Sequence, residues 1–512
     1  MGSPQKGNPF NEANLPTIAE IEKNWLLTTL QASGLAVGLP WSEPGNSEVG
    51  HSSMGSGRII YQYMPRIIFS IRDGSFFKNE ALLGAINHVK EKKSDLHLMG
   101  LFSSGSVHSY IDHLYALLEM AAQNNISHRV KIHIFTDGKD SSPKLGLTLV
   151  KNFTERINIL KQGKIATIMG RFWAMDRDQN WDRTKAAYFA LTGQEGTFIE
   201  NPLEYIQHSY DNGIYDESIK PAIVLENSEP VGKIKNNDAV IFFNFREDSV
   251  RQFTKAFVLP EFKGFDRELI KDLYFATMTK YEESLPVKIA FEPIEIKNPV
   301  GKVISGAGLK QIRIAETEKY AHVTYFFNAF EEKSFPGEDR VLIPSQPIEH
   351  FEDKPEMRAL EIGDKILEAI DKKYDFILAN FANADMIGHT GNYQATVKAL
   401  EAVDMVLGKI LKKILSMEKS ALLISADHGN AEMKINEKTG EISTEHTMNP
   451  IPFYLIVPPY KAVKTVTEIE LEKSQTLGFL SDIGPTILDL LGLGVPKEMT
   501  GKSLIKLFGI KI

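Results

Sequence analysis

Residues 421–430 read Ala-Leu-Leu-Ile-Ser-Ala-Asp-His-Gly-Asn. The first five are apolar or small and have the length of a buried strand, and the polar residues Asp427 and His428 follow soon after. In open α/β sheets, ligands bind beyond the carboxyl ends of the strands. Gly429 permits a backbone turn that would let both polar side chains reach one ligand. The stretch therefore predicts an α/β fold with a binding site at one edge of a sheet.

A second cluster of metal-binding residue types follows another short apolar run. Residues 375–379 predict a strand, and Asp385 and His389 follow in the loop or first helical turn beyond it. A carboxylate and an imidazole four residues apart can converge on one ion, and His446 adds a third polar loop. Each residue alone is more typical of a helix cap or a hydrogen-bonded core histidine. Together they predict one or two divalent ions of the manganese, zinc or magnesium type.

Short apolar runs alternate with helical patterns through most of the chain. Residues 130–135 and 239–243 predict further buried strands, whereas apolar residues three and four apart predict helices over 114–123 and 395–414. This alternation is typical of α/β layers around largely parallel sheets. Prolines interrupt regular structure over about 281–303, and we expect a hinge between domains there.

The composition is that of a multidomain globular protein. At 512 residues and 57.4 kDa the chain is too long for one ordinary core, so we expect two or three domains. A net charge of −8 gives no general attraction to nucleic acids or anionic membranes. The absence of cysteine excludes disulfides, thiolate nucleophiles and cysteine-bound zinc. No apolar run reaches membrane-spanning length and residues 1–10 have no signal-peptide core, so we expect a cytoplasmic protein.

Residues 45–51, Gly-Asn-Ser-Glu-Val-Gly-His, place the hydroxyl of Ser47 among glycines. Glycines let a backbone turn sharply and approach an anion closely, and Arg58 is near enough in sequence to help hold one. Ser47 is therefore the candidate nucleophile, although a stretch of this composition is by itself more typical of a surface turn. A serine needs activation, and paired divalent ions supply it by lowering the pKa of a coordinated hydroxyl.

Nine short motifs occur in order along the chain. They are GNSEVGH (45–51), VHS (107–109), MDRD (175–178), WDR (181–183), NFR (244–246), RIAETEKY (313–320), FPGEDR (335–340), ADHGN (426–430) and PKEMTGKSL (496–504). With this set the chain resembles, from about residue 7 to residue 507, the cofactor-independent phosphoglycerate mutases of the alkaline phosphatase superfamily. The resemblance implies that a monomeric enzyme interconverts 3-phosphoglycerate and 2-phosphoglycerate, in glycolysis and gluconeogenesis, without a bisphosphoglycerate cofactor.

The same resemblance implies a fold and a set of metal ligands. An alkaline-phosphatase-like three-layer α/β domain would comprise residues 1–62 and 294–512, interrupted by an inserted α/β phosphotransferase domain over 63–293. Ser47 would be the residue that is phosphorylated. Two divalent ions would be bound, with manganese expected in preference to zinc, cobalt or magnesium. One would be held by Asp385, His389 and His446, and the other by Ser47, Asp427, His428 and one further aspartate.

The residues implied to bind phosphoglycerate are mostly cationic. The matches to substrate-binding positions are Arg171, Arg177, Arg246, Lys139 and His108. Guanidinium groups suit both phosphate and carboxylate, although without the motifs these would be ordinary surface cations and a structural histidine. Lys319 matches a lysine that contacts the transferred phosphate, and Asp140 matches a residue that moves a proton on the glycerate hydroxyls. The implied mechanism is attack by Ser47, reorientation of glycerate, and return of the phosphate to its other hydroxyl.

Several positions depart from the family pattern. Members open with a hydrophobic strand ending in Asp-Gly-x-Gly, whose aspartate is the further ligand of the second ion, and residues 1–6 contain neither. A mis-assigned start, a truncation or an atypical protein with an impaired second site would each explain this. Ser249 and Lys139 stand where arginine is usual, and Arg251 could compensate for the first. The rival functions are a metal-dependent phosphatase of the same superfamily and an inactive relative.

Overall fold

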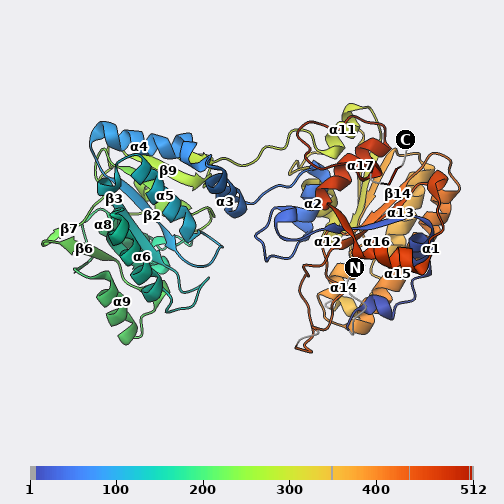
Figure 1. Cartoon of the computed structure of the whole chain (residues 1–512), viewed down its shortest axis with the longest axis horizontal. Coiled ribbons are helices and arrows are strands. Elements are labelled where there is room, and N and C mark those ends of the chain that lie inside the picture. The colour runs from blue at the N-terminus through green and yellow to red at the C-terminus, as the bar shows by residue number, and fades with distance from the viewer. Residues whose placement is uncertain (1–6, 348–349, 437–438, 507, 510–512) are drawn as a thin grey trace. The chain divides into compact units, whose positions relative to one another are not determined.

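The computed structural model describes residues 7–347, 350–436, 439–506 and 508–509. The chain forms two compact units, one built from Met1–Gln62 with Glu295–Ile512 and the other from Tyr63–Ile294 (Figure 1). Within the described ranges, no helix combines the length and the apolar character needed to cross a membrane. The departure expected at residues 1–6 lies outside the described residues.

The unit formed by residues 63–294 is built around one sheet. Its strands run in the order β10 (Lys288–Phe291), β9 (Tyr274–Thr279), β8 (Ala239–Phe242), β2 (Leu96–Phe102), β3 (Val130–Thr136), β4 (Lys164–Gly170), β6 (Ala222–Glu226) and β5 (Thr197–Ile199), with β7 (Glu229–Pro230) paired to β6. The strands from β10 to β4 are mutually parallel, as the alternating pattern predicted, whereas β4 and β6 are antiparallel. The carboxyl ends of β2, β3 and β4 therefore lie at one edge of the sheet.

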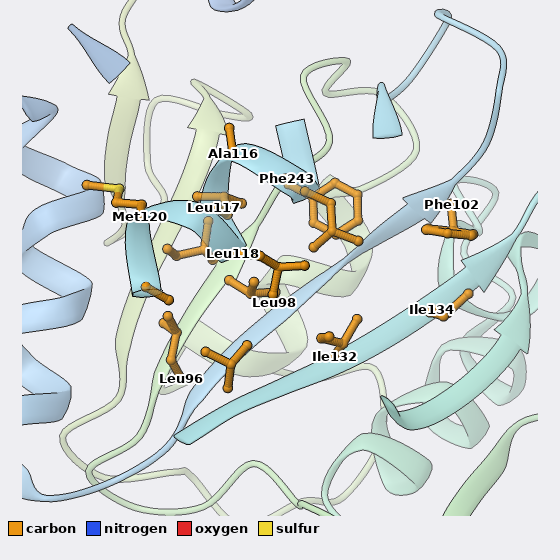
Figure 2. Close-up of a cluster of buried hydrophobic side chains, with 14 of the residues drawn as sticks. Leu96, Leu98, Phe102, Ala116, Leu117, Leu118, Met120, Ile132, Ile134 and Phe243 are labelled. Carbon is orange, nitrogen blue, oxygen red and sulfur yellow. The ribbon is translucent and has the colours of Figure 1, made fainter. Parts of the chain in front are cut away.

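Hydrophobic cores cover both faces of this sheet. Alternate residues of β2 point to opposite sides: Leu96 and Leu98 pack near helix α5 (Figure 2) in a core that also contains Phe102, and Met99 and Leu101 pack in the other core. Burial on both faces explains why the strand sequences are almost continuously apolar. The α-helices of this unit are α3 (Tyr63–Asp73), α4 (Glu80–Lys92), α5 (Ile111–Gln123), α6 (Gly146–Leu160), α7 (Arg171–Ala174), α8 (Trp181–Leu191), α9 (Pro202–Asp211) and α10 (Arg251–Val258).

The other unit contains two sheets. The first has the order β14 (Leu422–Ser425), β15 (Ile451–Ile456), β1 (Leu26–Gln31) and β16 (Thr476–Phe479), and the second has the order β12 (Glu338–Ile343), β11 (Gln311–Glu316) and β13 (Phe376–Ala379). The second sheet is parallel, but β15 runs antiparallel to both β14 and β1. The expectation of largely parallel sheets is therefore wrong for the first sheet. Burial on both faces makes a strand apolar in either direction, so the apolar runs do not report direction.

The helices of this unit pack on the two sheets and position the candidate site. They are α1 (Pro16–Asn24), α2 (Ser47–Ser56), α11 (Val300–Gly306), α12 (Thr317–Ala321), α13 (Ala359–Asp371), α14 (Asn383–Gly388), α15 (Tyr393–Leu415), α16 (Val466–Ser474) and α17 (Ile483–Leu490). The helix predicted over 395–414 is α15, which begins after Asn392, whose side chain accepts a hydrogen bond from the N–H of Ala395. The helix predicted over 114–123 lies within α5.

Strands β13 and β14 are the end strands of their sheets. Side chains of both contribute to the same two hydrophobic cores, so the two strands lie in one layer. All of their residues are only half-buried, whereas β11 is buried along its whole length. In the described part of the chain, no strand pairs with the outer edge of β13 or of β14. The two strands that lead into the predicted metal ligands are therefore less covered than their neighbours.

Candidate active site

Ser47 is the first residue of helix α2, whose start is fixed by a cap. The side chain of Asn46 accepts a hydrogen bond from the N–H of Val49 (3.1 Å). The positive end of the helix dipole therefore lies at Ser47, where it favours an anionic group. Ser47 is buried, and its Oγ lies 3.0 Å from Nε2 of His428 and 2.6 Å from Nζ of Lys319. The fold thus brings together three predicted site residues that are hundreds of positions apart in the sequence.

Three glycines of the GNSEVGH and ADHGN motifs lie where a larger residue would collide with its neighbours. Gly45, Gly50 and Gly429 do not have positive φ angles. A Cβ on Gly50 would lie 2.6 Å from the carbonyl oxygen of Asp427, and one on Gly45 would lie 2.0 Å from the carbonyl oxygen of Ala32. Gly45 and Gly50 therefore allow segments to pack at backbone-to-backbone distance. A Cβ on Gly429 would lie 2.2 Å from Oγ1 of Thr447, and the chain bends at the two residues before it, where the turn was expected.

Asp385, His389 and His446 converge on one point. Nε2 of His389 lies 3.0 Å from Nε2 of His446, and the two lie 3.2 and 3.3 Å from Oδ1 of Asp385. Nδ1 of His389 lies 2.8 Å from the carbonyl oxygen of Thr444, and Nδ1 of His446 lies 2.8 Å from that of Gly45. Because a carbonyl can only accept, each Nδ1 carries the proton and each Nε2 presents a lone pair. Two lone pairs and a carboxylate oxygen that face the same point suit a divalent cation.

Asp427, His428 and Ser47 form a second set beside this group. Nε2 of His428 lies 3.6 Å from Oδ1 of Asp427 and 3.9 Å from Oδ1 of Asp385, which places the two sets side by side. Oδ2 of Asp427 is buried with no hydrogen-bond partner among the described residues, and it lies 3.3 Å from Nδ1 of His51. A buried carboxylate oxygen that lacks a donor fits a cation ligand. Over the described ranges, the Asp385 group is the one set of three histidine, aspartate or glutamate side chains close enough to share an ion.

Positive groups keep the buried carboxylates ionised. Burial alone would raise the pKa of Asp385, but the neighbouring His389 and His446 and the charge of Lys319 lower it well below its usual value. Nζ of Lys319 donates to Oδ2 of Asp385 at 2.5 Å. Burial would also raise the pKa of Asp427, and the neighbouring histidines and Lys319 lower it. Both side chains are therefore in the charged form that metal binding requires.

The unit formed by residues 63–294 gathers the predicted proton-transfer and substrate groups. Arg171 is buried, and its Nη1 donates to Oδ2 of Asp140 (2.5 Å) and to Oδ1 of Asp137 (2.7 Å). Nε2 of His108 lies 3.8 Å from Oδ2 of Asp140. Burial, with the nearby charge of Arg171, lowers the pKa of His108 to about 4, so this histidine is neutral near pH 7.

Asp248 connects the other predicted substrate groups. Its Oδ2 lies 2.9 Å from Nη1 of Arg177 and 3.4 Å from Nη2 of Arg246, and its Oδ1 lies 3.7 Å from Nδ1 of His108. Both arginine side chains are about half exposed, and Lys139 is exposed. These cations can therefore reach an anion from solvent, whereas Arg171 is committed to two carboxylates.

Arg251, expected to compensate for the arginine that is missing at Ser249, contacts two acceptors of its own unit. Its Nε donates to the carbonyl oxygen of Tyr281 (2.7 Å), and its Nη2 lies 3.4 Å from Oε1 of Glu247. The hydroxyl of Ser249 donates to Oδ1 of Asp248 (3.1 Å). Compensation for Ser249 by Arg251 stays a prediction, because these contacts use Nε and Nη2 and the side chain is partly exposed.

Comparison with known proteins identifies the family. Residues 67–283 match the family described as BPG-independent PGAM N-terminus, and residues 311–473 match that described as type I phosphodiesterase / nucleotide pyrophosphatase. The 2,3-bisphosphoglycerate-independent phosphoglycerate mutase of Moorella thermoacetica is 46% identical over 506 residues, which cover 99% of this chain and 96% of that protein. The chain belongs to this mutase family. The corresponding mutase 2 of Methanosarcina barkeri is 47% identical over 515 residues, covering 98% of this chain and 95% of that protein.

A solved structure of a related mutase supports the α/β fold with an alkaline-phosphatase-like domain and an inserted domain. The crystal structure of Leishmania mexicana phosphoglycerate mutase at low cobalt concentration matches with a TM-score of 0.54 and 28% sequence identity, covering 98% of this chain and 95% of that one. The alkaline-phosphatase-like domain with an inserted domain, expected from the motifs, is therefore confirmed at the level of fold.

Four residues of the candidate site were not predicted individually: His51, Asp137, Asp248 and Asn430. Nδ2 of Asn430 donates to Oδ1 of Asp385 (2.8 Å), and this residue lies in the ADHGN motif as His51 lies in GNSEVGH. Membership of a motif could have identified both. Asp137 and Asp248 lie close in sequence to the predicted residues Asp140 and Arg246, but an aspartate in a loop is ordinarily a turn former and neither was singled out.

Proposed function

We propose that this chain interconverts 3-phosphoglycerate and 2-phosphoglycerate, and that Ser47 carries the phosphate between the two hydroxyls. The observation that carries this proposal is the position of Ser47. It begins a helix, and its hydroxyl contacts Lys319 and His428 beside the three ligands that converge at Asp385. The 46% identity to the Moorella mutase over almost the whole chain supports the substrate. A monomer is part of the proposal, as the family resemblance implies.

The proposal includes two divalent ions. Asp385, His389 and His446 would hold the first, and Ser47, Asp427 and His428 would contribute to the second. The donors are nitrogen and oxygen atoms, which suits manganese, with zinc, cobalt or magnesium as alternatives. Bound ions of this kind polarise a phosphoryl oxygen and lower the pKa of a coordinated hydroxyl. The related Leishmania mutase was crystallised with cobalt, one of these metals, at low concentration.

In this proposal, different residues carry out the separate steps of the reaction. Ser47 forms the new bond to phosphorus while the bond from phosphorus to the glycerate oxygen breaks. The ammonium of Lys319, 2.6 Å from Oγ of Ser47, offsets negative charge on the transferred group. The carboxylate of Asp140 takes the proton of the other glycerate hydroxyl as that hydroxyl attacks the phosphoserine, and passes it to the glycerate oxygen that the phosphate has left. Arg177 and Arg246 hold the glycerate, so the same phosphate is returned and none is released.

Phosphorus-31 NMR of 3-phosphoglycerate with the enzyme and Mn²⁺, without added bisphosphoglycerate, tests the proposal. We expect the signal of 2-phosphoglycerate to grow with no inorganic phosphate. Ser47→Ala should abolish the conversion, whereas Ser52→Ala should preserve it, because the Ser52 hydroxyl donates only to the carbonyl of Val49 in the same helix. Inorganic phosphate as the main product would indicate a phosphatase, and no product would indicate an inactive relative.

A further inference from the structure

Asp137 lies beside Arg171 and Asp140, two of the candidate substrate groups, and the mechanism above gives it no role. It is the first residue after β3, and it is 2% exposed. Its Oδ1 accepts hydrogen bonds from the N–H groups of Lys139 (3.2 Å) and Asp140 (3.1 Å) and from Nη1 of Arg171 (2.7 Å). Its Oδ2 accepts a hydrogen bond from Oγ of Ser103 (2.5 Å). Both oxygens are therefore fully used inside the protein.

We propose that Asp137 is a positioning residue for the mutase reaction. It fixes the guanidinium of Arg171, and through Arg171 and the loop backbone it holds the carboxylate of Asp140 in place for proton transfer. This inference rests on the proposed function. The link is direct, because a single nitrogen, Nη1 of Arg171, lies 2.7 Å from Oδ1 of Asp137 and 2.5 Å from Oδ2 of Asp140.

The register of three neighbouring strands creates this arrangement. In the parallel sheet, the last residues of β2, β3 and β4 lie opposite one another, and they are Phe102, Thr136 and Gly170. The next residue along each strand is therefore Ser103, Asp137 or Arg171. The three side chains meet because the strands end in register, and a shift of one residue in any strand would separate them.

The charge of Asp137 is part of this role. Burial alone would raise the pKa of Asp137, but hydrogen bonds from Ser103 and Arg171 lower it below its usual value. The ionised side chain therefore shares one buried guanidinium with Asp140. An amide at position 137 would remove one of the two negative partners and would place a donor group where an acceptor is needed. Arg171 would then be free to change its orientation, and Asp140 would move with it.

The catalytic constants of Asp137→Asn test the proposal. We expect kcat to fall about 100-fold, as displacing a reacting group by near 1 Å can cause, with little change in KM. The matched control is Asp73→Asn, because Asp73 is an exposed aspartate at the end of helix α3 that accepts a hydrogen bond from the N–H of Ser75 (2.8 Å). This control should leave both constants unchanged.

A double-mutant cycle then separates positioning from a general loss of structure. Because Asp137 acts through Arg171, Asp137→Asn should lower kcat far less in an Arg171→Lys background than in the wild-type background. Equal losses in both backgrounds, or a raised KM with unchanged kcat, would overturn the inference. If Asp137→Asn does not fold, Ser103→Ala takes its place in the cycle, with a smaller loss of kcat expected. A wild-type chain that forms no 2-phosphoglycerate would instead refute the proposed function. The failure of the inference can therefore be told apart from the failure of the proposed function.

Discussion

The substitution Gly50→Ala tests whether the contact between helix α2 and the Asp427 loop sets the geometry of the site. In an ordinary helix interior, replacing glycine by alanine stabilises a protein by about 0.5–1 kcal/mol. At Gly50 the new Cβ would lie 2.6 Å from the carbonyl oxygen and 2.8 Å from Cβ of Asp427, and neither atom can rotate away. Relaxing the first distance from 2.6 Å to the 3.4 Å of an ordinary contact requires a displacement of about 0.8 Å.

This displacement should lower both stability and activity. Overpacking typically costs about 1–3 kcal/mol, which exceeds the gain in helix propensity, so we expect the free energy of unfolding to fall by about 1–2 kcal/mol. The same movement would change the 3.0 Å contact between Oγ of Ser47 and Nε2 of His428. Since a misplacement near 1 Å can cost about 100-fold in rate, we expect kcat to fall by about that factor.

Denaturant unfolding measures the stability change, and initial rates with saturating Mn²⁺ measure kcat. Gly306→Ala is the matched control, because Gly306 is an exposed residue at the end of helix α11 and a Cβ there would meet nothing within 4 Å. The control should be as stable as the wild type or more so, with unchanged kcat. If Gly50→Ala behaves like Gly306→Ala, the close contact does not set the site geometry and the reasoning is refuted.

Three further substitutions probe the metal ligands and two buried ionisable groups. Asp385→Asn should weaken Mn²⁺ binding by at least about 10-fold in isothermal titration calorimetry, and an unchanged affinity would remove Asp385 from the ligand set. Burial raises the pKa of Glu316 to about 7, so this group lowers stability as the pH rises from 4.5 through 7. Glu316→Gln should therefore raise the free energy of unfolding by up to about 3 kcal/mol at pH 8 and change it little at pH 4.5, whereas a gain independent of pH would contradict this. Burial lowers the pKa of His113 to about 3, and neither ring nitrogen has a hydrogen-bond partner among the described residues, so stability falls as the pH drops below 6.5. His113→Leu should raise the free energy of unfolding by about 1–2 kcal/mol at pH 7 and by more at pH 5, and a loss of stability at either pH would count against it.

The sequence was sufficient to predict the elements that bury apolar residues in a regular pattern. The strand expected over 130–135 is β3, and that expected over 421–425 is β14. The same pattern could not predict the direction of a strand, because a strand such as β15 is apolar whichever way it runs. The strand β10 (Lys288–Phe291), inside the passage expected to be irregular, is too short to show a period among the surrounding prolines.

The candidate site was predictable where chemistry and motif coincide, as at Asp385, His389 and His446. The contacts that hold these residues depend on tertiary structure, such as the carbonyl of Gly45 that fixes the proton of His446. Asp137 could not be found from the sequence, since its importance arises only when three strands end in register. The catalytic roles themselves stay predictions until they are measured.

The most direct test of the account is the site of phosphorylation during turnover. The enzyme would be mixed with 3-phosphoglycerate and Mn²⁺, quenched in acid within the first turnovers, and digested for peptide mass spectrometry. The account predicts one phosphorylated residue, Ser47, with an amount that falls to the unmodified level once the substrate is removed. Formation of 2-phosphoglycerate with the phosphoryl group on another residue, or with none on the protein, would contradict it.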